Sequence, residues 1–327
     1  MTINLAECLR GVRTAAIAGH VNPDGDCIGS CMGLYLYLRD NFPDIQADVY
    51  MQKPREVFYY IEDLDKVRTE CDAEKKYDLL ILLDISSRDR IGVAGPYLET
   101  AGAVLCLDHH VTNQGKYTWF CNRPEASSAS EVVFDCLEPE KISRACAAAL
   151  YTGIVHDTGV FQYSNTSPKT MRTAAVLMEK GINFSRIVDE SFYQKTYVQN
   201  QIMGRTLMES IMLMEGRCIV GIVRQKEMRF YGLNPSDMDG IVSQLRNTIG
   251  VETAIFLYEL KPQTFKVSLR SKEIVDVSRI ASVFGGGGHV RAAGCTMEGT
   301  PYDVINNITP YIERQMKDWE EEHERNS

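Results

Sequence analysis

Short hydrophobic runs alternate with amphipathic stretches through the first half of the chain. The run Leu79–Leu83 is too short for a helix and suits a strand buried on both faces. Comparable patterns predict strands at 14–19, 45–51, 78–84 and 103–107, and helices at 28–39 and 143–156. This alternation predicts an α/β domain with a parallel sheet, in which ligands bind at the carboxyl ends of the strands.

Helical patterns dominate residues 168–210, and Gly181 ends one of these helices. Beyond Arg217 a second, smaller α/β unit begins, with predicted strands at 218–223, 253–259 and 265–270 and predicted helices at 239–248 and 275–284. Residues 317–327 are charged and are interpreted as a solvated end. The length suits two domains with separate cores. We assign them to residues 1–190 and 211–327, with a linker at 191–210.

Acidic residues and histidines gather where predicted elements end. They are His20, Asp24 and Asp26 after the first strand, Asp84 after the third, Asp108, His109 and His110 after the fourth, and Asp157 after the helix 143–156. Because the carboxyl ends of parallel strands share one edge of a sheet, these side chains can converge. Two divalent ions about 3.5–4 Å apart need several hard ligands of this kind. The pattern therefore predicts a two-metal site.

Each cluster also has a structural interpretation. Asp24 can cap a helix or form an Asx-turn, Asp84 can cap the segment that follows it, and His110 can be a satisfied core imidazole. His156 precedes Asp157, but successive residues on a helix point about 100° apart, so we interpret His156 as structural. The coincidence of all the clusters favours the metal site.

The composition narrows the range of partners. Lys and Arg number 35 against 44 Asp and Glu, a net charge of −9, so we expect no general basic surface for long nucleic acid. A short anionic substrate held by metals is compatible with this charge. No apolar run reaches the length of a membrane span, and Glu7 and Arg10 interrupt the N-terminus before a signal-peptide core. We therefore expect a cytoplasmic protein without a membrane partner.

The ten cysteines contain no Cys-x-x-Cys pair, and most lie in apolar stretches, as buried reduced thiols do. Cys27 and Cys31 are four residues apart on a predicted helix beside the first cluster. They are a less favoured half-site for a soft metal, because the carboxylates nearby favour hard ions.

Candidate phosphate-binding groups lie outside these clusters. Four glycines precede His289, and such a run is either a flexible turn or a place where backbone amides approach a phosphate. Arg270 and Ser271, at the end of a predicted strand, offer an anion clamp. Arg88 and Arg90, after the third strand, are interpreted as surface residues, and their reach to a substrate stays open.

Together these motifs resemble the DHH phosphoesterase family. The resemblance rests on H-V-N-P-D-G-D-C-I-G-S from His20, L-L-D ending at Asp84, D-H-H from Asp108 and H-D-T-G around Asp157. The second unit, with L-R-S and G-G-G-G-H-V-R-A-A-G, looks like the DHHA1 partner domain. The motif order and two-domain length most resemble the stand-alone bacterial oligoribonucleases, or nanoRNases, which also dephosphorylate 3′-phosphoadenosine 5′-phosphate. We expect no preceding sensory or membrane segment of the kind found in membrane-bound cyclic-dinucleotide phosphodiesterases.

The resemblance implies roles for individual residues. One Mn²⁺ ion would be held by His20, Asp24 and Asp84, and a second by Asp26, Asp84, His109 and Asp157, so that Asp84 bridges them and Mg²⁺ or Co²⁺ are substitutes. Asp108 would orient a histidine, and His110 would contact the scissile phosphate. The DHHA1 domain would grip the far phosphate or the nucleotide, across a substrate cleft between the domains, with Arg270, Ser271, Gly286, Gly287, Gly288 and His289.

The predicted function is that of a manganese-dependent phosphoesterase. It would hydrolyse short oligonucleotides to mononucleotides and 3′-phosphoadenosine 5′-phosphate to AMP, with a hydroxide activated by two metals. Cyclic di-AMP, its linear form pApA and pyrophosphate are alternative substrates. A non-catalytic nucleotide-binding regulator and an RNA-interaction module are alternatives from other classes, against which the complete ligand set and the acidic charge argue. The expected partners are short oligonucleotides or nucleotide phosphates, and homodimerisation is left open by the sequence.

Overall fold

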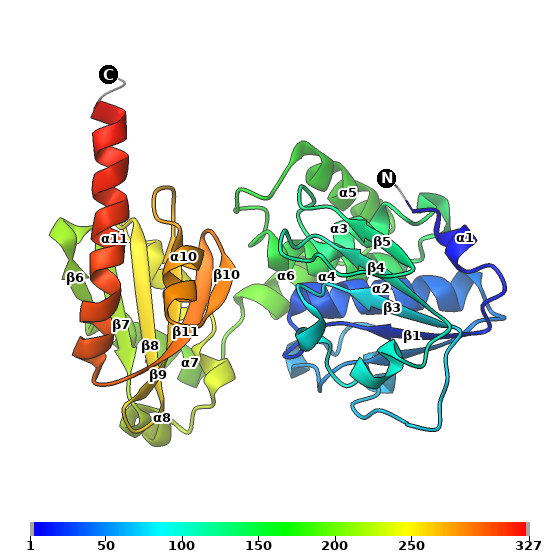
Figure 1. Ribbon diagram of the computed structural model, residues 1–327, viewed down its shortest axis with the longest axis horizontal. Helices are drawn as coiled ribbons and strands as arrows, with labels where there is room; N and C mark the ends of the chain where they lie inside the picture. The colour runs from blue at the N-terminus through cyan, green and yellow to red at the C-terminus, as the bar shows by residue number, and fades with distance from the viewer. Residues whose placement is uncertain (1–2, 325–327) are drawn as a thin grey trace. The chain divides into compact units, whose positions relative to one another are not determined.

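The computed structural model describes residues 3–324 and divides between Gln194 and Lys195 into two compact units. The first unit contains a five-stranded, wholly parallel sheet with the order β2-β1-β3-β4-β5 (Figure 1). Its strands are β1 (Thr14–Ala18), β2 (Gln46–Tyr50), β3 (Leu79–Leu83), β4 (Ala103–Asp108) and β5 (Trp119–Asn122). Its α-helices are α1 (Leu5–Cys8), α2 (Gly25–Asn41), α3 (Ala129–Phe134), α4 (Arg144–Asp157), α5 (Pro168–Glu179) and α6 (Phe184–Val188).

Strand β3 shows why this sheet is buried on both faces. Leu79, Ile81 and Leu83 belong to the hydrophobic cluster that contains α2 and α4. Leu80 and Leu82 point the other way, into a second cluster with buried tyrosines. Side chains alternate across a strand, so a wholly apolar strand needs a cover on each side. The predicted α/β domain with a parallel sheet is confirmed.

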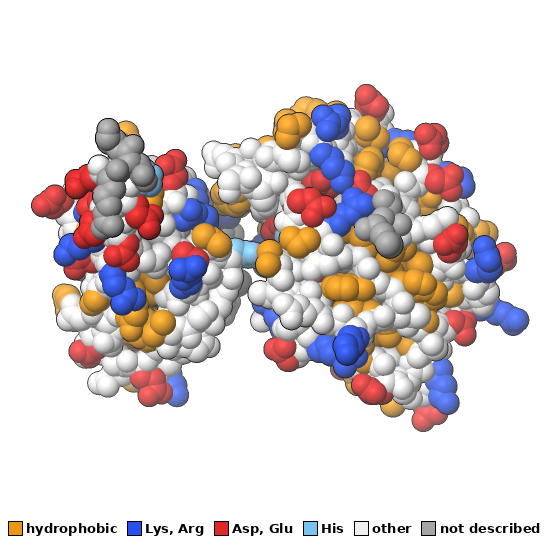
Figure 2. All heavy atoms as spheres, turned by 45° about the horizontal axis from the view of Figure 1, so that its top comes forward, with side chains coloured by type: hydrophobic (Ala, Val, Ile, Leu, Met, Phe, Trp, Pro, Cys, Tyr) orange, Lys and Arg blue, Asp and Glu red, His pale blue; other side chains and the backbone are white. Residues whose placement is uncertain are grey.

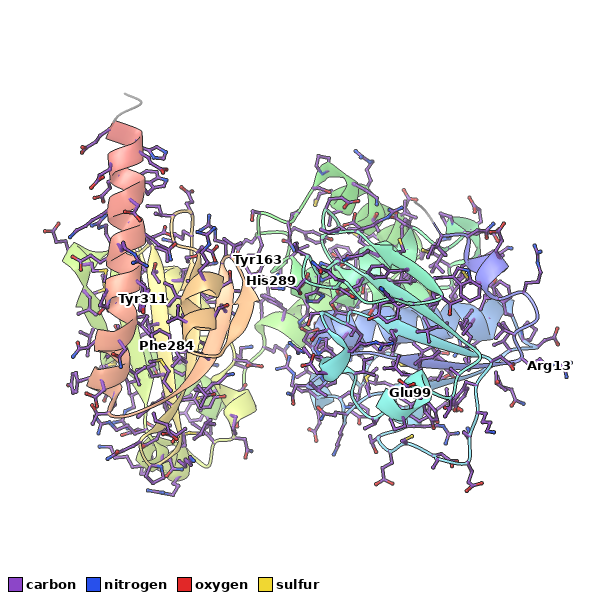
Figure 3. The ribbon with its side chains drawn as sticks, in the orientation of Figure 1. Arg13, Glu99, Tyr163, Phe284, His289 and Tyr311 are labelled. Carbon is purple, nitrogen blue, oxygen red and sulfur yellow. The ribbon has the colours of Figure 1, made fainter. Side chains whose placement is uncertain are left out.

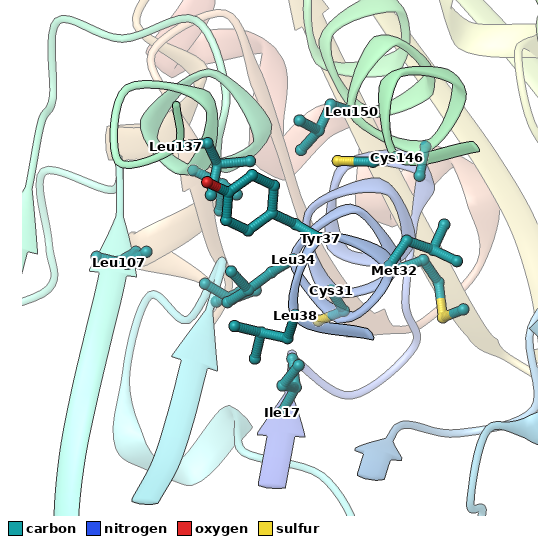
Figure 4. Packing of buried hydrophobic residues seen from close by; sticks show 14 of the residues in the cluster. Ile17, Cys31, Met32, Leu34, Tyr37, Leu38, Leu107, Leu137, Cys146 and Leu150 are labelled. Atoms are coloured by element: carbon teal, nitrogen blue, oxygen red, sulfur yellow. The ribbon is translucent and has the colours of Figure 1, made fainter. Parts of the chain in front are cut away.

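Helices α2 and α4 pack closely against each other because glycines lie at their contact. A Cβ atom added at Gly29 would come within 2.6 Å of the carbonyl oxygen of Ala149, and one at Gly33 within 2.5 Å of the Leu150 side chain. Figure 4 shows Leu150 and Cys146 beside buried residues of α2 such as Tyr37 and Met32. Both helices carry site residues at their ends, so this packing sets the distance between those residues.

The second unit contains a six-stranded mixed sheet with the order β10-β11-β9-β8-β7-β6. Its strands are β6 (Ile211–Leu213), β7 (Cys218–Val223), β8 (Thr253–Lys261), β9 (Thr264–Ser271), β10 (Gly287–His289) and β11 (Ala292–Glu298). Its α-helices are α7 (Tyr197–Met208), α8 (Gln225–Tyr231), α9 (Ile241–Arg246), α10 (Val277–Val283) and α11 (Pro301–Glu324). Strands β7 and β8 are parallel and the other neighbours are antiparallel. The predicted second α/β unit is confirmed.

As predicted, helical structure extends nearly to residue 210, and α7 lies within the proposed linker, 191–210. The end of the chain differs from the expectation. Apart from the partly buried Glu320, residues 317–324 of the expected solvated end are exposed, but they continue α11, and 325–327 lie outside the described residues. Helix α11 is anchored by buried side chains on one face, including Val304, Ile308 and Ile312. In Figure 3 Tyr311 of α11 lies near Phe284, just after α10, and their ring centroids are 5.8 Å apart.

The surface agrees with the mixed composition. On the face drawn in Figure 2, acidic and basic side chains are interspersed and no broad basic field is visible. Among residues 3–324, no helix combines the length and the apolar character needed to cross a bilayer.

Candidate metal centre

The loop between β1 and α2 brings His20, Asp24 and Asp26 together. Asp24 is the N-cap of α2, and its Oδ1 accepts hydrogen bonds from the backbone N–H groups of Asp26 and Cys27, each at 3.1 Å. The same oxygen lies 3.6 Å from Nε2 of His20. Asp24 therefore does cap the helix, as the structural interpretation predicts. In this position its carboxylate still lies beside the imidazole of His20.

Asp26 is buried, and the N-terminus of α3 holds its carboxylate. Its Oδ2 accepts from the backbone N–H of Ala129 at 2.6 Å, and its Oδ1 accepts from that of Ser130 at 2.9 Å. A Cβ atom at Gly153 of α4 would lie only 2.6 Å from Oδ1. Three helices thus fix the position of this one carboxylate.

Asp84 lies at the centre of the cluster. It follows β3 directly, and its backbone is left-handed with φ 56°. Oδ2 is 3.3 Å from Nε2 of His20, and Oδ1 is 3.5 Å from both Nε2 of His109 and Nδ1 of His110. Each oxygen of Asp84 therefore faces a different group of candidate ligands.

The Asp108-His109-His110 motif contributes at the end of β4. Nε2 of His109 lies 3.6 Å from Oδ2 of Asp157 and 4.0 Å from Oδ2 of Asp26. Nδ1 of His110 donates to Oδ1 of Asp108 at 2.9 Å, and the backbone N–H of His109 donates to the same oxygen at 2.8 Å. Asp108 thus orients the histidines after it, as a carboxylate behind an imidazole does.

Asn113 is a site residue that the sequence reasoning missed. Its buried amide Nδ2 donates to Oδ2 of Asp108 and to the carbonyl oxygen of Ile85, both at 2.7 Å. It therefore ties the segment after Asp84 to Asp108. The only signal in the sequence is its place shortly after the Asp-His-His motif.

His156 turns away from the cluster. Its Nε2 lies 3.0 Å from Oγ of Ser191, and its ring packs edge-on against Phe58 and Phe192. A Cβ atom at Gly25 would collide with this imidazole. The structural interpretation of His156 is confirmed.

The acids of the cluster influence one another strongly. Burial and the charge of Asp84 raise the pKa of Asp26 to about 7, and burial raises the pKa of Asp157 well above its usual range. Burial opposes ionisation of Asp84 as well, but His109 and His20 lower its pKa well below the ordinary value. Despite burial, the hydrogen bond to Asp84 raises the pKa of His109 to about 10.

These shifts describe a cluster with more carboxylates than its own cations can balance. Carboxylate oxygens and imidazole nitrogens are donors for divalent ions such as Mn²⁺, Mg²⁺ and Zn²⁺. Ligand atoms of Asp26, His109 and Asp157 all lie within 4.8 Å of one another, as do those of Asp84, His109 and His110. The donor set fits divalent metal binding.

A soft half-site is not favoured. Sγ of Cys27 lies within 4.8 Å of ligand atoms of His20 and Asp84. However, the carboxylates of Asp24, Asp26 and Asp84 predominate beside this thiol and favour hard ions over soft ones, and the Cys27 thiol itself donates to the carbonyl oxygen of His20 at 3.9 Å. Both cysteines are buried free thiols.

In the second unit, the glycine run forms an edge strand. A Cβ atom at Gly286 would lie 2.2 Å from the carbonyl oxygen of Gly294, and one at Gly288 would lie 2.5 Å from that of Ala292. Both glycines therefore allow β10 to approach β11, while Gly287 has open space around it.

The residues expected to bind phosphate in this unit occupy different environments. Ala292 pairs with His289 on one side and with Arg270 on the other, so these two residues lie in one row across the sheet. Ser271 is instead buried, and its Oγ donates to the carbonyl oxygen of Val275 at 2.6 Å.

Family models match both units. Residues 14–154 match the model described as DHH family, N-terminal domain, and residues 216–318 match the model described as DHHA1 domain.

The chain is also similar to named proteins along most of its length. It is 30% identical over 308 residues to the bifunctional oligoribonuclease and PAP phosphatase NrnA of Thermus thermophilus, covering 91% of this chain and 89% of that protein. It is 26% identical to the protein of the same name from Bacillus subtilis, covering 94% of this chain and 96% of that protein. A solved structure of an exopolyphosphatase-related protein from Bacteroides fragilis matches with a TM-score of 0.87 and 24% identity, over 95% of this chain and 94% of that one, which shows a shared fold.

Proposed function

Because the chain belongs to the DHH family of phosphoesterases, we propose that it hydrolyses short oligonucleotides to mononucleotides and 3′-phosphoadenosine 5′-phosphate to AMP. The observation that carries the proposal is the convergence of three imidazoles from separate segments on the two oxygens of Asp84, with the carboxylates of Asp24, Asp26 and Asp157 beside two of these imidazoles. The names of the Thermus thermophilus and Bacillus subtilis relatives support the choice of substrates.

Two Mn²⁺ ions, for which Mg²⁺ or Co²⁺ can substitute, are the proposed cofactors. His20, Asp24 and Asp84 would hold one ion, and Asp26, Asp84, His109 and Asp157 the other. Ions at such a site supply Lewis acidity to a phosphoryl group and lower the pKa of a bound water.

The chain's own residues position the reacting groups. Backbone N–H groups hold both oxygens of Asp26, and Asn113 and Asp108 hold the His110 ring. We assign to His110 the contact with the scissile phosphate. In the second unit, the row formed by Arg270 and His289, together with the glycines of β10, is the proposed anchor for the nucleotide. The buried hydroxyl of Ser271 supports this row through the following turn.

The test is product analysis by chromatography after incubation with Mn²⁺ and a substrate panel. The panel contains a 5′-phosphorylated dinucleotide, a 24-mer RNA, 3′-phosphoadenosine 5′-phosphate, cyclic di-AMP and pyrophosphate. We expect mononucleotides from the dinucleotide and AMP from 3′-phosphoadenosine 5′-phosphate, with the long RNA nearly untouched. Preferential hydrolysis of cyclic di-AMP would indicate a dinucleotide phosphodiesterase, and no hydrolysis at all would favour a nucleotide-binding regulator.

Asp84→Asn tests the proposed bridging ligand. The substitution preserves the size of the side chain, and Asn tolerates a left-handed backbone as Asp does. We expect turnover to fall more than 100-fold, beyond the roughly 10- to 100-fold loss that follows removal of an outer partner of a metal ligand. Asp44→Asn, at an exposed acid outside the cluster, is the control and should retain activity. An Asp84→Asn variant with parental turnover and Mn²⁺ affinity would refute the bridging role.

A further inference from the structure

Arg90 is held next to the candidate metal centre by its backbone. It ends the short 3₁₀-helix η3 (Arg88–Arg90), which follows Asp84 in the chain. The backbone N–H of Val21 donates to the carbonyl oxygen of Arg90 at 2.8 Å, and His20 forms an antiparallel bridge with Ile91. Arg90 therefore cannot move away from the loop that carries His20 without breaking these contacts.

The guanidinium of Arg90 lies beside the imidazole of His20. Its Nη2 is 3.4 Å from Nδ1 of His20 and 3.5 Å from the carbonyl oxygen of Val21. Nδ1 of His20 itself donates to that carbonyl at 2.8 Å. Nε2, separated from Nδ1 by one ring carbon, faces Asp24 and Asp84. The imidazole of His20, a proposed metal ligand, thus lies between the guanidinium and the carboxylates of Asp24 and Asp84.

Because Nδ1 of His20 donates to Val21, it cannot accept a hydrogen bond from the guanidinium, and the contact of the guanidinium with the carbonyl oxygen of Val21 is at the long end for a hydrogen bond. Within residues 3–324, no carboxylate forms an ion pair with Arg90, although Arg39, Arg123 and Arg186 each pair with at least one. Arg90 is also exposed. Its planar set of donors is therefore available to an anion from outside the chain.

We propose that Arg90 is a substrate-binding residue whose guanidinium donates to the non-bridging oxygens of the phosphate that is hydrolysed at the metal centre. The cluster is rich in carboxylates that repel a phosphate, and a cation at its rim offsets this repulsion. Arginine matches the geometry of phosphate with two parallel N–H donors. This inference rests on the proposed function and adds a specific contact on the His20 side of the site.

A supporting role for Arg90 behind His20 is the competing explanation, and the structure separates the two. The carbonyl oxygen of Val21 already accepts from Nδ1 of His20, which fixes the tautomer that leaves Nε2 as a ligand. Loss of Arg90 should therefore leave metal affinity intact and weaken substrate binding. If Arg90 served His20, metal affinity would fall instead.

The experiment compares Arg90→Gln, Arg90→Lys and Arg88→Gln in the full chain. Arg88 lies on the same 3₁₀-helix and is also exposed, but among the described residues it forms no hydrogen bond or ion pair with His20, so it is the matched control. Initial rates are measured with 3′-phosphoadenosine 5′-phosphate and with a 5′-phosphorylated dinucleotide at saturating Mn²⁺. Mn²⁺ affinity is measured by calorimetry on each protein.

For Arg90→Gln we expect kcat/KM to fall roughly 10- to 100-fold, the range for loss of a charge-assisted hydrogen bond, with Mn²⁺ affinity unchanged. Arg90→Lys should recover part of the loss because it restores the charge without the paired donors. Arg88→Gln should stay within about twofold of the parent. Parental kinetics of Arg90→Gln, or a loss of Mn²⁺ affinity that accounts for the loss of rate, would overturn the proposal.

Failure of the proposed function has a different signature, because the parent protein would then hydrolyse neither substrate. In that case the affinity of the Mn²⁺-loaded protein for AMP is measured by calorimetry in place of the hydrolysis rates. Weaker AMP binding by Arg90→Gln than by Arg88→Gln would still support the role of Arg90, and equal binding would refute it.

Discussion

Asn22 and Asp84 both adopt the left-handed backbone conformation, with φ 56°, at the edge of the sheet where the acids gather. For residues other than glycine this conformation costs about 1–3 kcal/mol, and such residues concentrate at functional sites. Asn and Asp tolerate it better than most side chains. At Asp84 the turn follows β3 at once, so the carboxylate faces histidines from two different segments.

Asn113 supports a prediction about activity at the residue scale. Asn113→Ala removes the donor to Asp108 and to Ile85, so the His110 ring loses its fixed position. We expect a roughly 10- to 100-fold loss of activity, similar in size to the loss that follows removal of a residue orienting a metal ligand. Steady-state kinetics measure the loss of activity.

Asn41→Ala is the matched control for this effect. Asn41 also donates to two backbone carbonyls, those of Tyr37 and Lys141, but it lies at the far end of α2. If the two variants lost similar stability but only Asn113→Ala lost activity, the result would support a role of Asn113 in positioning His110. Equal activity in the two variants would contradict it.

At the scale of elements, the contact between α2 and α4 determines the spacing of the site. In Gly29→Ala the new methyl group would lie 2.6 Å from backbone atoms of both Ala149 and Gly153, so the helices must separate. We expect a loss of about 1–3 kcal/mol in the free energy of unfolding, as for overpacked cores. Urea unfolding measures it.

Gly204 provides the comparison, since it lies within α7 with no atom near its added Cβ. Gly204→Ala should raise stability by about 0.5–1 kcal/mol, the usual gain from alanine in a helix. If both substitutions stabilised the protein, close helix packing at Gly29 would be the wrong explanation.

Strand β2 carries an ion-pair cluster that predicts pH dependence. Asp48 accepts from Lys75 and Tyr77, both at 2.5 Å, and from Arg68 at 2.8 Å. Although burial opposes it, these partners lower the pKa of Asp48 below its ordinary 3.8. A lowered carboxyl pKa stabilises the fold above about pH 3.8, and this contribution is lost as the pH falls through the folded-state value.

We therefore expect Asp48→Asn to lower the free energy of unfolding by about 1.5–3 kcal/mol at pH 7, the range for hydrogen bonds to a charged group. The difference from the parent should shrink at pH 2, where Asp48 of the parent is increasingly protonated. Denaturant unfolding at the two pH values measures both. The control is Asp44→Asn, just before β2, which should change stability little at either pH. If Asp48→Asn lost the same stability at pH 7 and at pH 2, the ion-pair explanation would be excluded.

At the scale of the whole molecule, each unit has its own core and its own sheet. The candidate ligands for the metals all lie in the first unit. The two tryptophans divide between the units, with Trp119 in β5 and Trp319 in α11. Variants with a single tryptophan can therefore report on each unit separately.

Mn²⁺ should stabilise the first unit because it neutralises the crowded acids in the folded state only. When the Mn²⁺ concentration is about 100 times the dissociation constant, binding at one site adds about 2.7 kcal/mol to the free energy of unfolding. In Trp319→Phe the urea midpoint reported by Trp119 should rise with Mn²⁺ and fall with chelator. In Trp119→Phe the midpoint reported by Trp319 should move less. An unchanged Trp119 midpoint would count against metal binding by this cluster.

The sequence by itself determined the central strands and the grouping of the site. The run Leu79–Leu83 is apolar at every position, so a strand with both faces covered is its stable environment. The ends of parallel strands meet at one edge whatever the details of the loops, which is why His20, Asp84 and Asp108 could be grouped in advance. The residue-by-residue ligand assignment came from the family resemblance and stays a prediction.

Only the tertiary structure decided the elements and contacts whose partners are distant in the chain. Strand β5 has a weak local pattern and pairs along the edge of β4, and β11, whose buried residues are small or sulfur-containing, pairs with both β9 and β10. The links from Asn113 to Asp108 and from Arg90 to His20 depend on loops meeting after the sheet has formed. Hydrophobic periodicity reports which residues are buried locally, but it carries no information on which buried or exposed polar groups meet across the fold.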